Sequence, residues 1–217
     1  MKTGNQRKLY TSITTLGMFV LWTVLLKVVD VKSIGPLESE VGFATINAFV
    51  HRLTGVHMTL YTITDWLGLV PIFTAMSFGL LGLAQWIKRK SLKKVDYSIF
   101  VLGGLYIAVI ALYILFETVT VNYRPVLING VLEASYPSST TLLVLCVMPT
   151  VVLQLNSRIK NKAVKECVRI VIWAFIIFMV AGRLISGVHW FTDIVGGVLL
   201  STSLVTMYEF LVKKTDE

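Results

Sequence analysis

Three side chains of complementary chemistry lie within twelve residues of this sequence: the guanidinium of Arg183, the imidazole of His189 and the carboxylate of Asp193. Apolar stretches flank them on both sides, and charged groups at membrane depth are costly enough to indicate a function. His189 and Asp193 are four residues apart, so on a helix the carboxylate can accept from one ring nitrogen and leave the other free. A break at Ser186-Gly187 lets Arg183 end one helix while His189 opens the next. The alternative is an arginine and a histidine that only anchor helix ends at the membrane interface.

A second group of polar residues precedes these in the chain. Arg124 stands before a proline in a loop between apolar stretches, and Pro137, Ser138, Ser139 and Thr140 begin the next stretch. Proline at a helix start leaves backbone amides of the first turn unpaired, and with the helix dipole those donors form an anion site. Each motif alone is commonly a turn or an ordinary helix cap. Their joint placement with two arginines and a histidine held by an aspartate suggests phosphate chemistry.

The composition indicates a membrane protein. Hydrophobic residues make up 55% of the 217 residues and the mean hydropathy is +0.76, which is too apolar for a soluble domain of this length. The net charge of +8 is clustered between apolar spans, which argues against nucleic-acid binding. Neither a disulfide framework nor a zinc site follows from the two cysteines, Cys146 and Cys167. No cofactor is expected, and no group of carboxylates or histidines on the side of Arg183 has metal-ligand spacing.

We predict an all-α, polytopic membrane domain that covers residues 1–217. Six apolar runs are long enough to span a bilayer, and a shorter amphipathic run suits a helix that lies in the interface. The first run is long for a signal peptide and no cleavage site follows it, so it is expected to remain as a helix. The predicted spans are about 9–29, 66–87, 97–120, 137–155, 167–185 and 191–212, with an interfacial helix at about 41–56.

The basic residues predict which ends of these helices face the cytoplasm. Fifteen of the twenty lysines and arginines lie near the two termini, in the 88–94 loop and in the 158–169 segment, which all fall on one side. The positive-inside rule makes that side cytoplasmic, with both termini there. Arg124 and Arg183 fall on the opposite side, where the rule gives no reason for them. We therefore expect extracytoplasmic chemistry, and we see no inverted repeat that would indicate a transporter.

The order Arg-Pro, Pro-Ser at a helix start and Arg-x5-His-x3-Asp resembles the three-part signature of the type 2 phosphatidic acid phosphatase superfamily. Its bacterial members include six-span lipid phosphatases such as phosphatidylglycerophosphate phosphatases. The resemblance covers spans three to six by motif and the whole chain by topology. It implies that His189 is the nucleophile, forming a phosphohistidine, and that Asp193 orients and stabilises it. The phosphate-binding residues that it implies are Arg124, Arg183, Ser138, Ser139 and Thr140.

The sequence departs from the family pattern in all three parts. Glu117 replaces a lysine seven residues before Arg124, Ser139 and Thr140 replace Gly-His, and Gly182 replaces a serine. The missing histidine is the family's general acid, and losing such an acid costs about 10²- to 10⁴-fold in rate. A lipid phosphate monoester has an alkoxide leaving group that needs this proton, whereas a diphosphate has a better leaving group and needs it less. If the third span continues to about residue 122, Glu117 lies below Arg124 and either pairs with it, donates the proton or only packs.

Five other residues on this side are weaker candidates. His51 and His57 lie in or beside the amphipathic segment and are expected to be interfacial anchors. Glu133, Tyr123 and Tyr136 are outer-loop residues with no preferred role.

These observations together predict a metal-independent phosphatase in a bacterial plasma membrane, with its site on the extracytoplasmic side. By resemblance, the preferred substrate is phosphatidylglycerophosphate, which would be hydrolysed to phosphatidylglycerol. Undecaprenyl diphosphate and then phosphatidate are the next choices of substrate. The expected partners are this substrate in the outer leaflet and membrane lipids, with no obligate protein partner. The alternative is a lipid-phosphate binding or carrier protein that has lost turnover, which Glu117 and Thr140 favour. His189 and Asp193 argue against it, because an anion receptor needs no oriented nucleophile.

Overall fold

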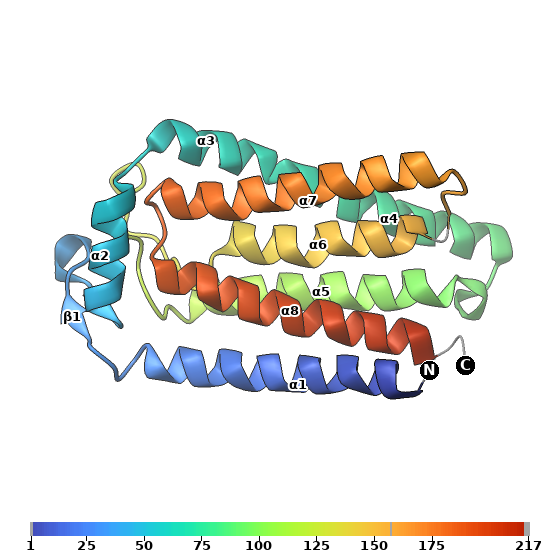
Figure 1. The fold of residues 1–217 in the computed structure, drawn as a ribbon, viewed down its shortest axis with the longest axis horizontal. Helices are drawn as coiled ribbons and strands as arrows, with labels where there is room; N and C mark the ends of the chain where they lie inside the picture. The colour runs from blue at the N-terminus through green and yellow to red at the C-terminus, as the bar shows by residue number, and fades with distance from the viewer. Residues whose placement is uncertain (1, 157, 215–217) are drawn as a thin grey trace.

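The structure is a computed structural model that describes residues 2–156 and 158–214. It is built almost entirely of α-helices, which confirms the predicted fold class (Figure 1). A two-stranded antiparallel ribbon, β1 (Lys32–Ser33) with β2 (Glu40–Val41), and two short 3-10 helices, Pro36–Glu38 and Leu92–Lys94, lie between them. The α-helices are α1 (Lys2–Leu25), α2 (Ala44–Thr54), α3 (Met58–Leu67), α4 (Leu69–Arg89), α5 (Tyr97–Thr118), α6 (Ser139–Asn156), α7 (Lys162–Ile185) and α8 (Phe191–Lys214).

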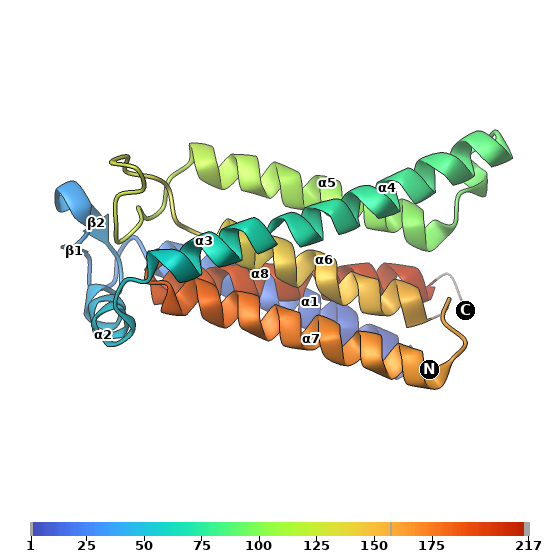
Figure 2. The ribbon, with the colours of Figure 1, turned by 90° about the horizontal axis from the view of Figure 1, so that it is seen from above.

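Among the residues that the structure describes, six helical segments are long and apolar enough to span a membrane, as predicted. The second differs most from its predicted bounds, because α3 and α4 form one segment over Met58–Arg89 that begins before residue 66 (Figure 2). At 1.5 Å per residue these 32 residues extend about 48 Å, more than the hydrocarbon core of about 30 Å. Thr62, Thr64 and Asp65 lower the hydropathy of the first turns, so the apolar pattern alone begins near Trp66. The first helix also differs, ending at Leu25 before a series of turns.

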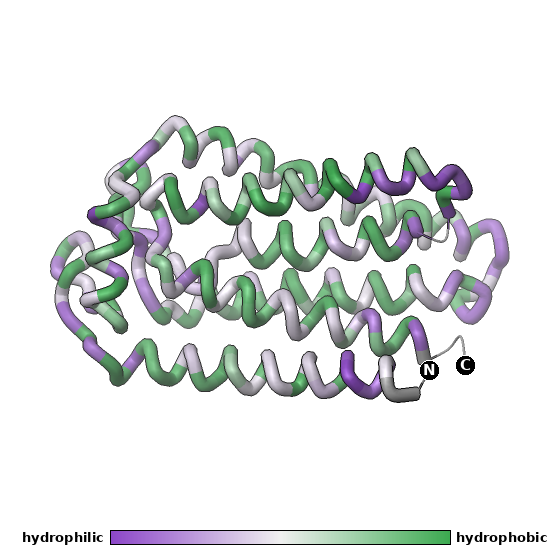
Figure 3. The backbone as a smooth tube through the Cα atoms, in the orientation of Figure 1, coloured by the Kyte–Doolittle hydropathy of each residue, from purple (hydrophilic) through white to green (hydrophobic). Residues whose placement is uncertain are grey.

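The helices run side by side along the long axis, and the two ends of the bundle differ in character (Figures 1 and 2). At one end lie both chain ends and the connections from α4 to α5 and from α6 to α7. At the other end α2 lies across the bundle beside the β1–β2 ribbon, at the position of the predicted interfacial helix. The hydropathy colouring shows strongly hydrophilic segments in those α4–α5 and α6–α7 connections (Figure 3). The predicted placement of both termini at the same end is confirmed.

The main core cluster brings α1, α5, α6 and α8 together. Tyr136, which is 1% exposed, lies in this cluster just before α6 and shares a 2.7 Å hydrogen bond with the hydroxyl of Thr23 on α1. A Cβ at Gly196 would overlap the Tyr136 ring, so only glycine lets α8 pack this closely. The contact fixes the start of α6 against the first turns of α8, and these two helix ends carry several of the predicted site residues.

Candidate active site

The turn between α7 and α8 holds the predicted nucleophile. Helix α7 ends at Ile185, so the break predicted at Ser186-Gly187 is present. Gly187 has φ +68°, and a Cβ there would overlap the carbonyl oxygen of Gly55, so the turn requires glycine. The prediction that His189 opens the next helix is wrong in detail, since α8 begins at Phe191. His189 lies in the turn itself, where its imidazole is free of helical constraints.

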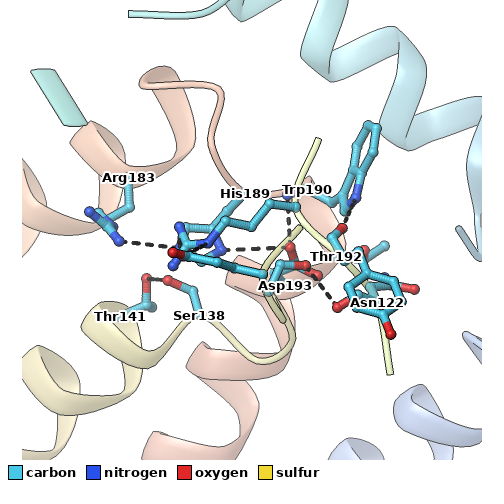
Figure 4. A network of polar contacts seen from close by, with 12 residues as sticks. Asn122, Ser138, Thr141, Arg183, His189, Trp190, Thr192 and Asp193 are labelled. Carbon is cyan, nitrogen blue, oxygen red and sulfur yellow. Dashed lines mark hydrogen bonds and ion pairs between the residues drawn. The ribbon is translucent and has the colours of Figure 1, made fainter. Parts of the chain in front are cut away.

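The imidazole of His189 faces Arg183, as Figure 4 shows, and also Arg124. Its Nε2 lies 3.4 Å from Nη1 of Arg124 and 3.3 Å from Nη2 of Arg183. Guanidinium nitrogens only donate, so Nε2 carries the lone pair and the ring proton sits on Nδ1. Burial, followed by the positive charges of Arg124 and Arg183, lowers the pKa of His189 well below 6.5. A neutral imidazole with its lone pair between two guanidiniums is the form that can attack phosphorus.

Asp193 lies in the first turn of α8 and is fully buried. Its Oδ2 accepts a 2.8 Å hydrogen bond from the backbone N–H of Trp190, which caps the helix, and lies 3.7 Å from Nδ1 of His189. Asn122 and Ser135 adjoin the same carboxylate. The carboxylate therefore has a structural function as a cap, and it also lies on the Nδ1 side of the imidazole, where it can orient the ring.

Arg183 occupies the last turn of α7 and its side chain is 1% exposed. Its Nη1 lies 3.5 Å from Oδ1 of Asp65, and its Cζ lies 4.9 Å from the centre of the Tyr61 ring. Both neighbours belong to α3. A guanidinium buried this deeply requires such partners to offset its desolvation.

Arg124 lies in the loop between α5 and α6, and its partner is not the one that the sequence suggested. Its Nε lies 3.0 Å from Oε2 of Glu133, and its backbone N–H donates to the Glu133 carbonyl. The expected helical stacking of Glu117 below Arg124 is wrong, because α5 ends at Thr118. The β-branched run that follows from Thr118 to Val121 has low helix propensity. Glu117 instead lines a cavity shared with His189.

The start of α6 places its three predicted anion ligands differently. Ser138 is buried, its N–H donates to the Asp193 carbonyl at 3.1 Å, and its hydroxyl accepts from Thr141 (Figure 4). Ser139 lines the cavity with His189 and Glu117. Thr140 directs its γ-methyl toward Gly68, at the junction of α3 and α4. Ser138 and Ser139 therefore adjoin the site, whereas the methyl group of Thr140 packs on another helix.

Comparison with known proteins places this arrangement in a family. Residues 117–216, which contain Arg124, Arg183, His189 and Asp193, match the model of the PAP2 superfamily. This C-terminal part of the chain is thus similar in sequence to the PAP2 superfamily. No curated protein sequence matches it.

The fold of the whole chain is similar to that of the first transmembrane PAP2 type phosphatidylglycerolphosphate phosphatase from Bacillus subtilis. The two chains are 18% identical, the similarity covers 95% of this chain and 96% of that chain, and the TM-score is 0.62. At this identity the likeness shows a common fold. Together with the six apolar helices among the described residues, this fold makes the chain a multi-pass membrane protein.

Several residues around the candidate site had no predicted role there. Asn47 of α2 binds the backbone N–H of Thr192 through its Oδ1 at 3.2 Å, and His51 lies 3.2 Å from the Gly187 carbonyl and contacts the Trp190 ring. His51, which we expected to be an interfacial anchor, thus packs on the turn that holds His189. The sequence offered one signal of such a role, a polar Asn47 among the apolar residues of an amphipathic helix. In the structure Asn47 is fully buried. Within residues 2–156 and 158–214, no group of three histidines, cysteines or carboxylates could hold a metal ion.

Proposed function

We propose that this chain is a metal-independent membrane phosphatase that cleaves a lipid phosphate through a phosphohistidine on Nε2 of His189. The observation that carries the proposal is the buried Nε2 with guanidinium donors at 3.4 and 3.3 Å. A phosphoryl group placed there meets a nucleophile and two fixed cations at once. Preorganised donors of this kind stabilise charge that develops on phosphoryl oxygens, and each is worth about 10²- to 10³-fold in rate.

The proposed reaction has two steps. The Nε2 lone pair of His189 attacks phosphorus, an N–P bond forms, and the bond from phosphorus to the lipid oxygen breaks as that oxygen takes a proton. Asp193 stabilises the positive imidazole that results, since its Oδ2 is 3.7 Å from Nδ1. Water then attacks phosphorus and gives a proton to the group that donated one in the first step, the N–P bond breaks, and inorganic phosphate and the neutral imidazole are released.

Glu117 is proposed as the donor of the proton in the first step. It lines the same cavity as His189, and the pairing role considered for it is filled by Glu133, which lies beside Arg124. Thr140 would be a very poor acid, and its γ-methyl group faces Gly68. A carboxylic acid near the leaving oxygen supplies the general acid that the family pattern lacks here.

Phosphatidylglycerophosphate is the first substrate that we propose, with undecaprenyl diphosphate and phosphatidate next. Its support is the shared fold with the Bacillus subtilis phosphatidylglycerolphosphate phosphatase. The lysines and arginines of the α4–α5 and α6–α7 connections, at the end opposite His189, support an extracytoplasmic site in a bacterial plasma membrane.

The decisive experiment is phosphate release from phosphatidylglycerophosphate and undecaprenyl diphosphate in detergent, with and without a chelator. We expect chelator-resistant release that His189→Ala lowers by at least about 10³-fold, since the nucleophile is lost. His57→Asn is the matched control, because that imidazole contacts only the nearby Thr54 carbonyl among the interactions described. An alkali-stable, acid-labile phosphoprotein should form in the native chain and in His57→Asn, but not in His189→Ala. Binding of lipid phosphate without release from either lipid would instead support a carrier.

A further inference from the structure

One face of α3 contacts Arg183 on two sides of its guanidinium. We infer that Asp65 and Tyr61 are positioning residues that hold Arg183 in register with His189, so that α3 belongs to the phosphate site. The inference rests on the proposed phosphatase function for its chemistry and on the contacts of α3 for its geometry. Neither residue belongs to the signature that identified the site.

The contacts of the guanidinium leave it little freedom to rotate. Nη1 lies 3.5 Å from Asp65 Oδ1, whereas Nη2 lies 3.3 Å from Nε2 of His189. The Tyr61 ring lies 4.9 Å from Cζ, within the range of a cation–π contact. Tyr61 and Asp65 are four residues apart and therefore share one helical face. One terminal nitrogen is thus paired with α3, and the other is directed at the nucleophile.

Helix α3 is itself fixed against α7 around Arg183. The backbone N–H of His57, the residue before α3, donates to the Ser186 carbonyl at 2.9 Å. On α7, one turn before Ser186, a Cβ at Gly182 would lie 2.7 Å from the γ-methyl of the buried Thr64 on α3. Glycine at 182 therefore permits the close approach that brings Asp65 to Arg183. Serine, the residue that the family pattern has at this position, would push α3 away.

Asp65 acts through Arg183 in this arrangement. Its side chain is 57% exposed, and the contact that connects it with the site is to Nη1 of the arginine. Removing its charge should let the guanidinium rotate away from Nε2, and misplacement of a catalytic group by about 1 Å can cost about 10²-fold.

The first test compares Asp65→Asn and Asp65→Glu with Thr62→Ala, an exposed control on the same helix. The substrates are a short-chain phosphatidylglycerophosphate and p-nitrophenyl phosphate, whose leaving groups differ in their need for a proton. We expect Asp65→Asn to lower kcat/KM about 10- to 50-fold for both substrates. Asp65→Glu should recover part of this loss, and Tyr61→Phe should retain more activity than Tyr61→Leu. Unchanged kinetics would refute the inference, and a loss confined to the alkyl phosphate would show that Asp65 is an acid instead.

The second test uses the contact between the two helices. Gly182→Ala should lower turnover as Asp65→Asn does, and adding Thr64→Ser should restore it to within about 3-fold, because serine lacks the methyl group but keeps the hydroxyl. A loss that Thr64→Ser does not repair would contradict the proposed contact. Thermal stabilisation by inorganic phosphate, weaker in Asp65→Asn than in the native chain, gives a readout that does not require turnover. A native chain that is stabilised by phosphate but hydrolyses neither substrate would count against the phosphatase function alone.

Discussion

The two arginines of the site present the same group to the same nitrogen and both lie near the Tyr61 ring, with Cζ at 4.9 Å for Arg183 and 6.0 Å for Arg124, but their other supports differ. Arg183 ends a 24-residue helix and is supported by the side of α3. Arg124 lies in a loop whose order depends on two isolated bridges, Tyr123 with Ala134 and Ile128 with Val131. Each has one carboxylate partner, 57% exposed for Asp65 and 39% exposed for Glu133. The helix should fix the position of one donor, while the loop lets the other adjust to the head group.

The two arginines also differ in their electrostatic effect. Both lower the pKa of His189, and after burial the charge of Arg124 contributes more than that of Arg183. The loop arginine therefore sets the charge of the site more strongly, while the helical arginine is the more tightly packed. These two properties can be separated by substitution.

The largest difference is expected between Arg183→Gln and Arg124→Gln. Arg183→Gln should lower kcat about 10³-fold, because the rigid donor is lost from a site with no room to rearrange. Arg124→Gln should lower kcat about 10²-fold and also raise KM, since a mobile donor contributes to substrate capture. Steady-state kinetics on one lipid phosphate measures both. Equal losses, or a larger loss for Arg124→Gln, would contradict the assignment of rigidity to the helix.

The two carboxylates on the loop side of the site should respond differently to neutralisation. Glu117→Gln should lower turnover of alkyl phosphates about 10²-fold and leave p-nitrophenyl phosphate almost unchanged, as expected for loss of a general acid. Glu133→Gln should lower both about 5-fold, because an ion pair that is partly exposed contributes about 1 kcal/mol. The measurement is the ratio of the turnover rates with an alkyl phosphate and with p-nitrophenyl phosphate, compared between each variant and the native chain. A uniform loss in Glu117→Gln would remove its role as the acid.

The glycines of the two turns extend the comparison to stability. Gly130→Ala, in the Arg124 loop, meets nothing within 4 Å and should cost about 1 kcal/mol for its left-handed backbone. Gly187→Ala has the same backbone penalty and would also collide with the Gly55 carbonyl, so it should cost several times more. Thermal unfolding in detergent compares the two. Similar melting temperatures would show that the α7–α8 turn relaxes easily.

The sequence was sufficient for the helices and the signature, but not for the partners of the arginines. Long apolar runs predicted the six spans, and the basic residues placed Arg124 and Arg183 at one end. The pairing of Arg124 with Glu133 depends on a loop that folds back without periodicity, so no helical spacing could indicate it. The pairing of Arg183 with Asp65 depends on the close approach at Gly182, which is a tertiary contact between helices far apart in sequence.

The charge difference between the arginines can be measured directly on His189. Protonation would place a third positive charge in a buried site, so the lowered pKa keeps the imidazole neutral at pH values well below 6.5. The nucleophilic lone pair is then available at neutral and mildly acidic pH, and it is lost only when the pH falls through that low pKa. The chain has three histidines, so ¹⁵N-histidine NMR with His189→Asn as the assignment reference can follow this ring alone. Arg124→Gln should raise its pKa toward 6.5 and Arg183→Gln should raise it less. If Arg183→Gln raised the pKa of His189 more than Arg124→Gln did, the helical arginine would dominate the charge of the site as well as its geometry.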